Sequence, residues 1–169
     1  MQIIFCWQKD KILNLQQVYM NDSKKRTLVD VLLIEDNIVD VRLLEEAFQE
    51  EQLNVNLQSV LDGEEALDFL LKKNKHSKAT TPDLIILDLN LPKLNGHEIL
   101  KRIKDDPNLK TIPVIILTSS QSEEDIINSY KLQANSYIKK PFDLDGFRAV
   151  VRSIDQFWFA IAKLPKNDA

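Results

Sequence analysis

Short apolar segments rich in β-branched residues alternate five times with longer segments whose apolar residues recur at helical spacing. The predicted strands are residues 29–34, 55–60, 84–87, 114–117 and 136–138. The predicted helices are residues 38–51, 64–72, 97–105, 123–132 and 144–161. Strands that alternate with helices in this way pair in parallel and are covered on both faces. The pattern therefore predicts an α/β fold with a doubly wound, five-stranded parallel sheet.

The alternating region has the size of one domain. The chain has 169 residues, of which 44% are hydrophobic, and this suffices for one continuous core. We expect a domain at 27–164, an N-terminal extension at 1–26 and a tail at 165–169. Because Met20 is followed by a polar leader and then at once by a strand, we interpret Met20 as the true start. Residues 1–19 then arise from an upstream start; a partner-binding helix is the alternative.

Composition excludes several classes of function. A net charge of -4 argues against nucleic-acid binding through charge alone. The single cysteine, Cys6, permits neither an intramolecular disulfide nor a cysteine-based zinc site. No apolar run approaches the roughly 20 residues of a membrane-spanning helix, and the chain start does not have the order of a secretory signal. We therefore expect a soluble cytoplasmic protein that binds neither nucleic acid nor membrane.

Polar residues follow four of the five predicted strands. They are Glu35 and Asp36 after the first strand, Asp88 and Asn90 after the third, Thr118 after the fourth and Lys140 after the fifth. Parallel crossovers are right-handed, so the loops that follow the strands lie at one edge of the sheet, where such folds bind ligands. The sequence therefore predicts a single pocket that contains all six residues.

Three of these residues are carboxylates, which repel one another unless a cation compensates their charge. Mg²⁺ prefers oxygen ligands and is held by one or two carboxylates plus phosphate oxygens. We expect Asp36 and Asp88 to bind it directly and Glu35 to act through water. A phosphoryl group that moves onto Asp88 also needs positive charge and hydrogen bonds, which Lys140 and the Thr118 hydroxyl can supply.

Some of these residues also have a simpler interpretation. Glu35 and Asp36 taken alone are as typical of helix N-caps as of a metal site, and the matching Asp88, Thr118 and Lys140 decide against the N-cap interpretation. Thr118 can cap the next helix.

Four sequence blocks resemble the signature blocks of CheY-like receiver domains of response regulators, in the same order and on the same elements. They are VLLIEDN, PDLIILDLNLPKLNG, PVIILTSS and YIKKPF. The resemblance extends from Leu28 to about Ile161. A single block of this kind is a weak signal, whereas four in register around one predicted site are a specific one.

The resemblance implies a role for each residue of the predicted pocket. Asp88 would be the phosphoacceptor, Glu35 and Asp36 the acidic metal pair, Asn90 a metal ligand through its backbone carbonyl, Thr118 the switch hydroxyl, Tyr137 the switch aromatic and Lys140 the phosphate-binding lysine. Without the resemblance, Tyr137 reads as a half-buried strand residue. The metal would be Mg²⁺, with Mn²⁺ as a substitute. The family also leads us to expect a cis peptide bond before Pro141.

By this resemblance the chain is a response regulator of a two-component phosphorelay. A sensor histidine kinase would phosphorylate it, and it would signal through protein contacts without an output domain. It would not be an enzyme, although it would assist its own phosphorylation and dephosphorylation. The long loop before Pro82 and the aromatic last helix resemble the stand-alone regulators paired with cyanobacterial phytochrome kinases, so a bacterial phytochrome is a possible partner.

Two alternatives come from other functional classes. A haloacid-dehalogenase-like phosphatase also uses an aspartate nucleophile with Mg²⁺, but it needs a second acid where this chain has Asn90. A binding-only pseudo-receiver would be expected to have lost Asp88, Lys140 or the acidic pair, all of which are present. The pseudo-receiver remains the alternative to the phosphorelay function.

The last helix carries more apolar surface than one face of a sheet can cover. Phe157, Trp158 and Phe159 widen its core stripe, and we expect them to contribute to a homodimer or kinase interface with the last strand. The simpler alternative is a helix end folded under the tail. The two histidines, His76 and His97, are expected on the surface.

Overall fold

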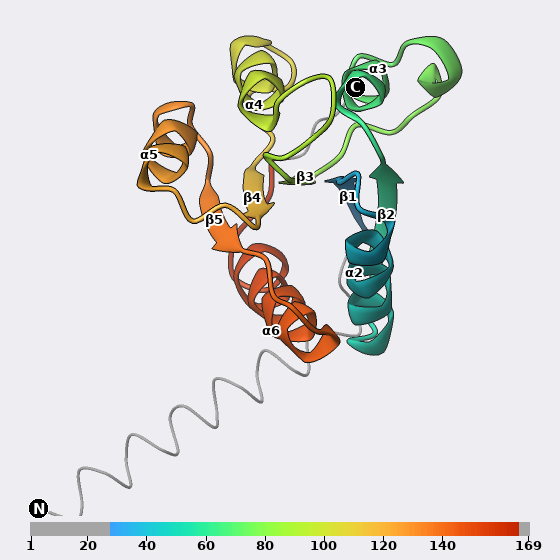
Figure 1. The fold of residues 1–169 in the computed structure, drawn as a ribbon. Coiled ribbons are helices and arrows are strands. Elements are labelled where there is room, and N and C mark those ends of the chain that lie inside the picture. The colour runs from blue at the N-terminus through green and yellow to red at the C-terminus, as the bar shows by residue number, and fades with distance from the viewer. Residues whose placement is uncertain (1–27, 166–169) are drawn as a thin grey trace, which may run out of the picture.

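A computed structural model of the chain describes residues 28–165, and the predictions for residues 1–26 and Met20 lie outside this range. Figure 1 shows one sheet between two layers of helices. The strands are β1 (Val29–Ile34), β2 (Val55–Val60), β3 (Leu84–Leu87), β4 (Val114–Thr118) and β5 (Ser136–Lys139). All pairs are parallel, in the order β2-β1-β3-β4-β5. This is the flavodoxin-like order of a doubly wound sheet, so the predicted fold class is confirmed.

The helices of residues 28–165 cover both faces of the sheet (Figure 1). The helices are α2 (Ile38–Glu50), α3 (Gly63–Leu70), α4 (Gly96–Asp105), α5 (Glu123–Lys131) and α6 (Leu144–Ile154). α2 and α6 pack side by side on one face, where Leu44 and Phe147 are fully buried. α3, α4 and α5 lie on the opposite face, where Ile99 and Ile103 enter the core. Because β3 and β4 are apolar on both sides, neither face can be left to solvent.

Polar caps fix the starts of the helices close to the ends of the strands. Asn37 accepts a hydrogen bond from the Val39 amide, and Asp62, Asn95, Ser122 and Asp143 cap the other four helices in the same way. Such caps satisfy amides that have no partner within the helix. Asn37 and Asn95 start α2 and α4 at the ends of the loops that follow β1 and β3, and these loops carry polar residues of the sheet edge.

The last helix differs from its prediction as one regular helix over 144–161. α6 ends at Ile154 and continues as a π turn, η3 (Asp155–Phe159), in which the Ala160 amide donates to the Asp155 carbonyl. Three consecutive aromatic residues cannot all face the core at the 100° spacing of an α-helix. In the wider turn, Trp158 and Phe159 pack against the core while Phe157 is left exposed.

Smaller differences occur at the ends of other elements. α3 begins at Gly63 and ends at Leu70 instead of spanning 64–72, because Lys72 has a positive φ of 53° that no α-helix accommodates. β4 and β5 are each one residue longer than predicted, and Thr118 pairs with Lys139. Within residues 28–165, no helix is long and apolar enough to cross a membrane.

Candidate functional site

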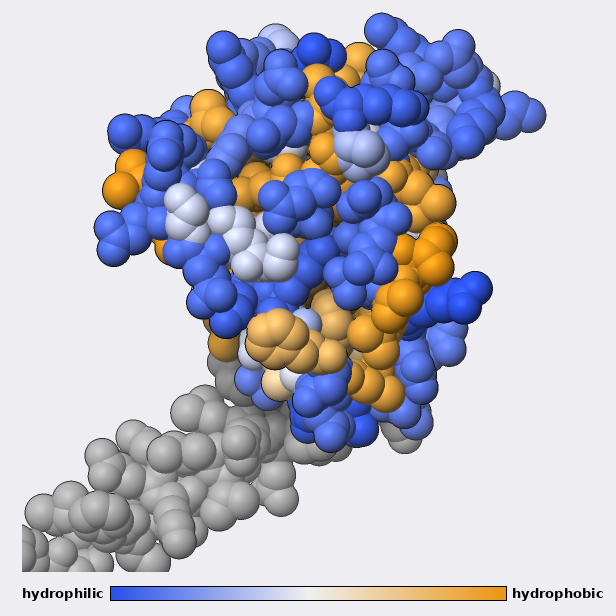
Figure 2. Space-filling view, in the orientation of Figure 1, coloured by the Kyte–Doolittle hydropathy of each residue, from blue (hydrophilic) through white to orange (hydrophobic). Residues whose placement is uncertain are grey.

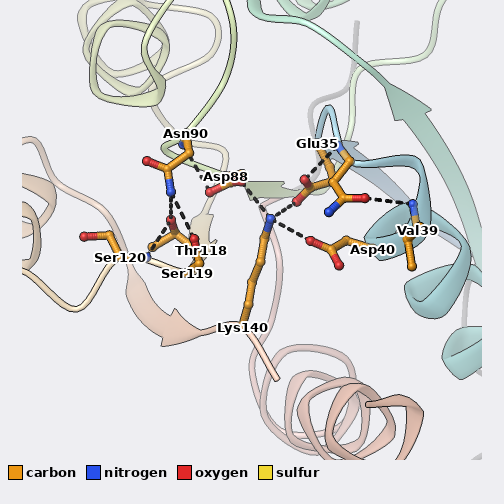
Figure 3. Close-up of polar contacts among 10 residues, drawn as sticks. Glu35, Val39, Asp40, Asp88, Asn90, Thr118, Ser119, Ser120 and Lys140 are labelled. Atoms are coloured by element: carbon orange, nitrogen blue, oxygen red, sulfur yellow. Dashed lines mark hydrogen bonds and ion pairs between the residues drawn. The ribbon is translucent and has the colours of Figure 1, made fainter. Parts of the chain in front are cut away.

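The carboxyl ends of the strands bring four buried polar side chains together, as Figure 3 shows. Glu35, Asp88, Thr118 and Lys140 have at most 8% of their surface exposed. Asp36 and Asn90 lie beside them and are exposed. The pairing of Thr118 with Lys139, together with a 2.8 Å hydrogen bond from the Lys140 amide to the Thr118 carbonyl, sets Lys140 beside the end of β4. The six residues predicted to share a pocket therefore lie at one edge of the sheet.

The Lys140 ammonium lies at the centre of the site. Its Nζ is 2.6 Å from Glu35 Oε2, 2.7 Å from Asp88 Oδ2 and 3.0 Å from Asp40 Oδ2. An ammonium has three N–H donors, so these three carboxylates use its full donor capacity. A buried charge without such partners would be strongly destabilising.

Burial and charge shift the protonation of this network. Burial raises the pKa of the Glu35 carboxyl to about 7, although the hydrogen bond and charge of Lys140 act against the rise. The charge of Asp88 adds to the rise. Burial lowers the pKa of the Lys140 ammonium, but hydrogen bonds to Asp88 and Glu35 outweigh it, so that this pKa lies above its usual value. The lysine is therefore charged at neutral pH, while Glu35 is poised to bind or release a proton.

Backbone around Asp88 fixes the second oxygen of its carboxylate. The Asn90 amide donates to Asp88 Oδ1 at 3.2 Å. The start of α4 packs directly on this turn, where the Gly96 amide donates to the Leu89 carbonyl. A Cβ on Gly96 would collide with the backbone of Asp88 and Leu89, so only glycine permits this close approach. The NG pair at the end of the second signature block thus has a direct structural role.

The hydroxyl of Thr118 faces the same space from β4. Asn90 Nδ2 donates to Thr118 Oγ1 at 3.3 Å and to Ser119 Oγ at 3.2 Å (Figure 3). The Ser120 amide approaches Thr118 Oγ1 at 3.4 Å. Asn90 thus links the loop after β3 to the loop after β4.

Tyr137 contacts the loop after β4 through its hydroxyl. This hydroxyl donates to the Ser120 carbonyl at 3.2 Å, and the half-buried ring packs against the core below α3 to α5. Ser120 Oγ in turn donates to Asp125 Oδ2, in the first turn of α5. Burial raises the pKa of the Tyr137 hydroxyl, so it remains a donor at neutral pH. Tyr137, the loop and α5 therefore form one connected unit.

Three carboxylates form a possible metal site. One oxygen each from Glu35, Asp36 and Asp88 lies within 4.8 Å of the others. Oxygen donors with this excess of negative charge suit a hard divalent cation such as Mg²⁺. Among residues 28–165 this is the one group of three or more acidic, histidine or cysteine side chains with such spacing.

Two features of the site differ from what the sequence suggested. Asp40, which contacts Lys140, was not predicted as a site residue; its one sequence signal is its place in the first turn of the helix after the acidic pair. No cis peptide bond occurs in residues 28–165, so the expectation for Pro141 is wrong; Lys140 reaches the site from the trans isomer, the usual one.

The two histidines are half-buried instead of exposed on the surface. His76 Nε2 lies 3.2 Å from Glu65 Oε1, and its ring packs on Phe69. His97 Nε2 lies 3.1 Å from Ser129 Oγ, which joins α4 to α5. Neither histidine belongs to the site at the strand ends.

Comparison with known proteins decides the family. The model of the response regulator receiver domain matches residues 31–152, which contain every residue of the site. The chain belongs to the response regulator receiver family. As such, it is a component of two-component signalling, and the CheY-like resemblance of the four blocks is confirmed.

The receiver is similar to several characterised regulators. It is 40% identical to Response regulator Rcp1 of Synechocystis sp. over 80% of this chain and 92% of Rcp1. The crystal structure of the phosphorylated cyanobacterial phytochrome response regulator RcpA has a TM-score of 0.79 and 42% identity, and the match covers 83% of this chain and 100% of that one. The Mn²⁺-bound form of Rcp1 has a TM-score of 0.77 and 39% identity, with 82% and 99% coverage.

Proposed function

We propose that the receiver accepts a phosphoryl group on Asp88. The observation that carries this proposal is the contact between Asp88 Oδ2 and the Lys140 ammonium within a buried site that also contains the Thr118 hydroxyl. Phosphoryl transfer depends mainly on positioning and on neutralising charge on the phosphoryl oxygens. Lys140 supplies a fixed positive charge, and Thr118 a hydroxyl that binds an oxygen of the new phosphoryl group.

Glu35, Asp36, Asp88 and the backbone carbonyl of Asn90 would hold Mg²⁺, for which Mn²⁺ can substitute. The spacing of the three carboxylates supports this assignment, as does the Mn²⁺-bound structure of the similar Rcp1. The bound ion would supply positive charge to the phosphoryl oxygens. Glu35 must be ionised to take part, so its raised pKa makes the site sensitive to pH around neutrality.

Phosphorylation would be passed on through Thr118 and Tyr137. A phosphoryl group adds about -1.5 to -2 charge and new acceptor oxygens close to Thr118. If the Thr118 hydroxyl turns to bind it, its contacts with Asn90 and the Ser120 amide change. The loop after β4 then moves with Tyr137, and the surface of α5 and β5 changes. In this proposal the protein's catalytic role is confined to assisting its own phosphorylation and dephosphorylation.

The donor we propose is a sensor histidine kinase in the cytoplasm, and a phytochrome-type kinase by analogy with the phytochrome response regulator RcpA. Exposed apolar side chains next to the site suit a protein donor. They are Ile38 and Val39 at the start of α2, and Phe142, which follows Lys140 by two residues and is itself 91% exposed. Figure 2 shows hydrophobic atoms on the surface over α2. The output would pass through protein contacts, with neither nucleic acid nor membrane as a partner.

We also propose that two copies associate through β5 and the end of α6. β5 is an edge strand, and beside it lies a pocket of about 220 Å³ lined in part by Ile138, Ile154, Phe157 and Trp158. Phe157 is 53% exposed and meets Trp158 edge-on. Exposed aromatic residues beside a pocket are typical anchors of protein interfaces. Phe159 packs below them and would support the interface.

The proposed phosphorylation of Asp88 is tested by measuring the intact mass of the protein after incubation with acetyl phosphate, with Mg²⁺ or with a chelator. The parent protein and Asp105→Asn, a control at an exposed aspartate at the end of α4, should gain one phosphoryl group only with Mg²⁺. Asp88→Asn should gain none. If neither acetyl phosphate nor a phosphorylated kinase modifies the parent protein, the binding-only alternative holds.

A further inference from the structure

Asp40 is a partner of Lys140 that does not belong to the predicted metal site. Its Oδ2 lies 3.0 Å from the Lys140 Nζ, and its side chain is 20% exposed. Within the described part of the chain, the acidic group whose oxygens converge comprises Glu35, Asp36 and Asp88, without Asp40. In Figure 3, Asp40 approaches the ammonium from α2, on the side away from Asn90 and Thr118.

A simpler explanation of Asp40 is that it stabilises the start of α2. Acidic residues in the first helical turn interact favourably with the helix dipole, and an acid at this position can also bind the amide of the capping residue. Here that amide, of Asn37, donates instead to Glu35 Oε1 at 3.1 Å, and the Val39 amide is bound by the Asn37 side chain. The Asp40 carboxylate is directed to Lys140.

The three acceptors of Lys140 differ in what phosphorylation requires of them. Glu35 and Asp88 belong to the acidic group that would bind the metal, and Asp88 would itself carry the phosphoryl group. The ammonium must therefore exchange at least one of these two contacts for a phosphoryl oxygen. Asp40 is bound by neither the metal nor the phosphoryl group, so its contact with Lys140 can persist throughout.

We propose that Asp40 is a positioning residue that holds the Lys140 ammonium in the site while its other contacts pass to the phosphoryl group. This inference rests on the proposed phosphorylation of Asp88. It assigns Asp40 an effect on the rate of phosphorylation that acts only through Lys140. A charge that merely stabilised α2 would have no such dependence.

A double-mutant cycle on the rate of phosphorylation by acetyl phosphate, in saturating Mg²⁺, tests the proposal. Asp40→Asn should slow the reaction by about fivefold, the size expected for two groups in direct contact. Asp40→Glu, which keeps the charge, should restore most of the rate. In the background of Lys140→Ala, Asp40→Asn should change the remaining rate by less than about twofold.

A second measurement applies even where the rate of Lys140→Ala is too slow to follow. The ¹⁵N NMR signal of a held, buried ammonium is visible because its protons exchange slowly. The Lys140 signal should be lost or broadened in Asp40→Asn and present in Asp40→Glu. An unchanged rate and unchanged ammonium signal in Asp40→Asn, or an equal slowing with and without Lys140, would overturn the inference. A parent protein that is not phosphorylated at all would instead overturn the proposed function.

Discussion

The hydroxyl of Tyr137 donates a hydrogen bond to the Ser120 carbonyl, 3.2 Å away, and thereby joins β5 to the loop after β4. Thr118 is the last residue of β4, directly before that loop, so the proposed movement of Thr118 would reach Tyr137 through a single turn of backbone. This contact and the hydrogen bond from Ser120 Oγ to Asp125 Oδ2 connect the loop after β4 to β5 and to α5.

Removing this hydrogen bond should have a modest and local effect. We expect Tyr137→Phe to lower the free energy of unfolding by about 1 kcal/mol, the usual net value of a hydrogen bond, because the ring still packs in place. Urea denaturation measures this change, and amide NMR shifts should change most at residues 119–122. An unchanged stability together with unchanged shifts in this loop would mean that the hydrogen bond does not hold the loop.

Mg²⁺ should stabilise the folded protein through the acidic group. Metal that binds only the folded state at about 100 times its dissociation constant adds about 2.7 kcal/mol, which raises Tm. Asp36→Asn should abolish the rise, because it removes one of the proposed metal ligands. Asp36 is exposed, and its replacement leaves the contacts of Lys140 intact, so the metal-free protein should be little changed. Thermal unfolding with Mg²⁺ and with a chelator checks this, with Asp105→Asn as the matched control. A rise in Tm that survives in Asp36→Asn would place the metal elsewhere.

Metal-free stability should depend on pH through Glu35. Its pKa rises from 4.5 to about 7 on folding, so between these values the folded protein binds more protons than the unfolded one. The free energy of unfolding therefore falls as the pH rises through this interval. Denaturation by urea in the presence of a chelator at several pH values should show a steeper fall for the parent protein than for Glu35→Gln. Identical slopes would show that the Glu35 pKa is not raised.

The proposed association depends on an exposed aromatic residue. Phe157→Ser should weaken self-association by about tenfold or more, since an exposed aromatic beside a pocket is a typical anchor. Phe142→Ser removes an equally large exposed aromatic from the other end of the sheet and is the matched control. Sedimentation equilibrium measures both. A monomeric parent protein, or equal effects of the two substitutions, would contradict the interface.

The sequence predicted the strands well because burial on both faces leaves a strong signal. β1, β2 and β3 have the predicted bounds, and the polar residues at the strand ends meet as the parallel topology required. The π turn after Ile154 was not predictable, because it depends on how three consecutive aromatic residues divide between the core and the surface.

The contacts between segments far apart in the sequence were the part of the site that could not be predicted. Asp40 and Lys140 are separated by 100 residues, and an acid in a first helical turn has an ordinary local explanation. The partner of His97 lies on α5, a neighbour known only from the fold. Such contacts depend on rotamers and packing, whereas the strand-end residues followed from topology alone.

The most direct test of the central claim is to identify the phosphorylated residue chemically. After phosphorylation in Mg²⁺, borohydride reduces an acyl phosphate to an alcohol, so that peptide mass spectrometry locates the modified side chain. We predict a single modified residue, Asp88, in the peptide that contains β3. Reduction at Asp36 or at another carboxylate, with Asp88 unchanged, would contradict the account.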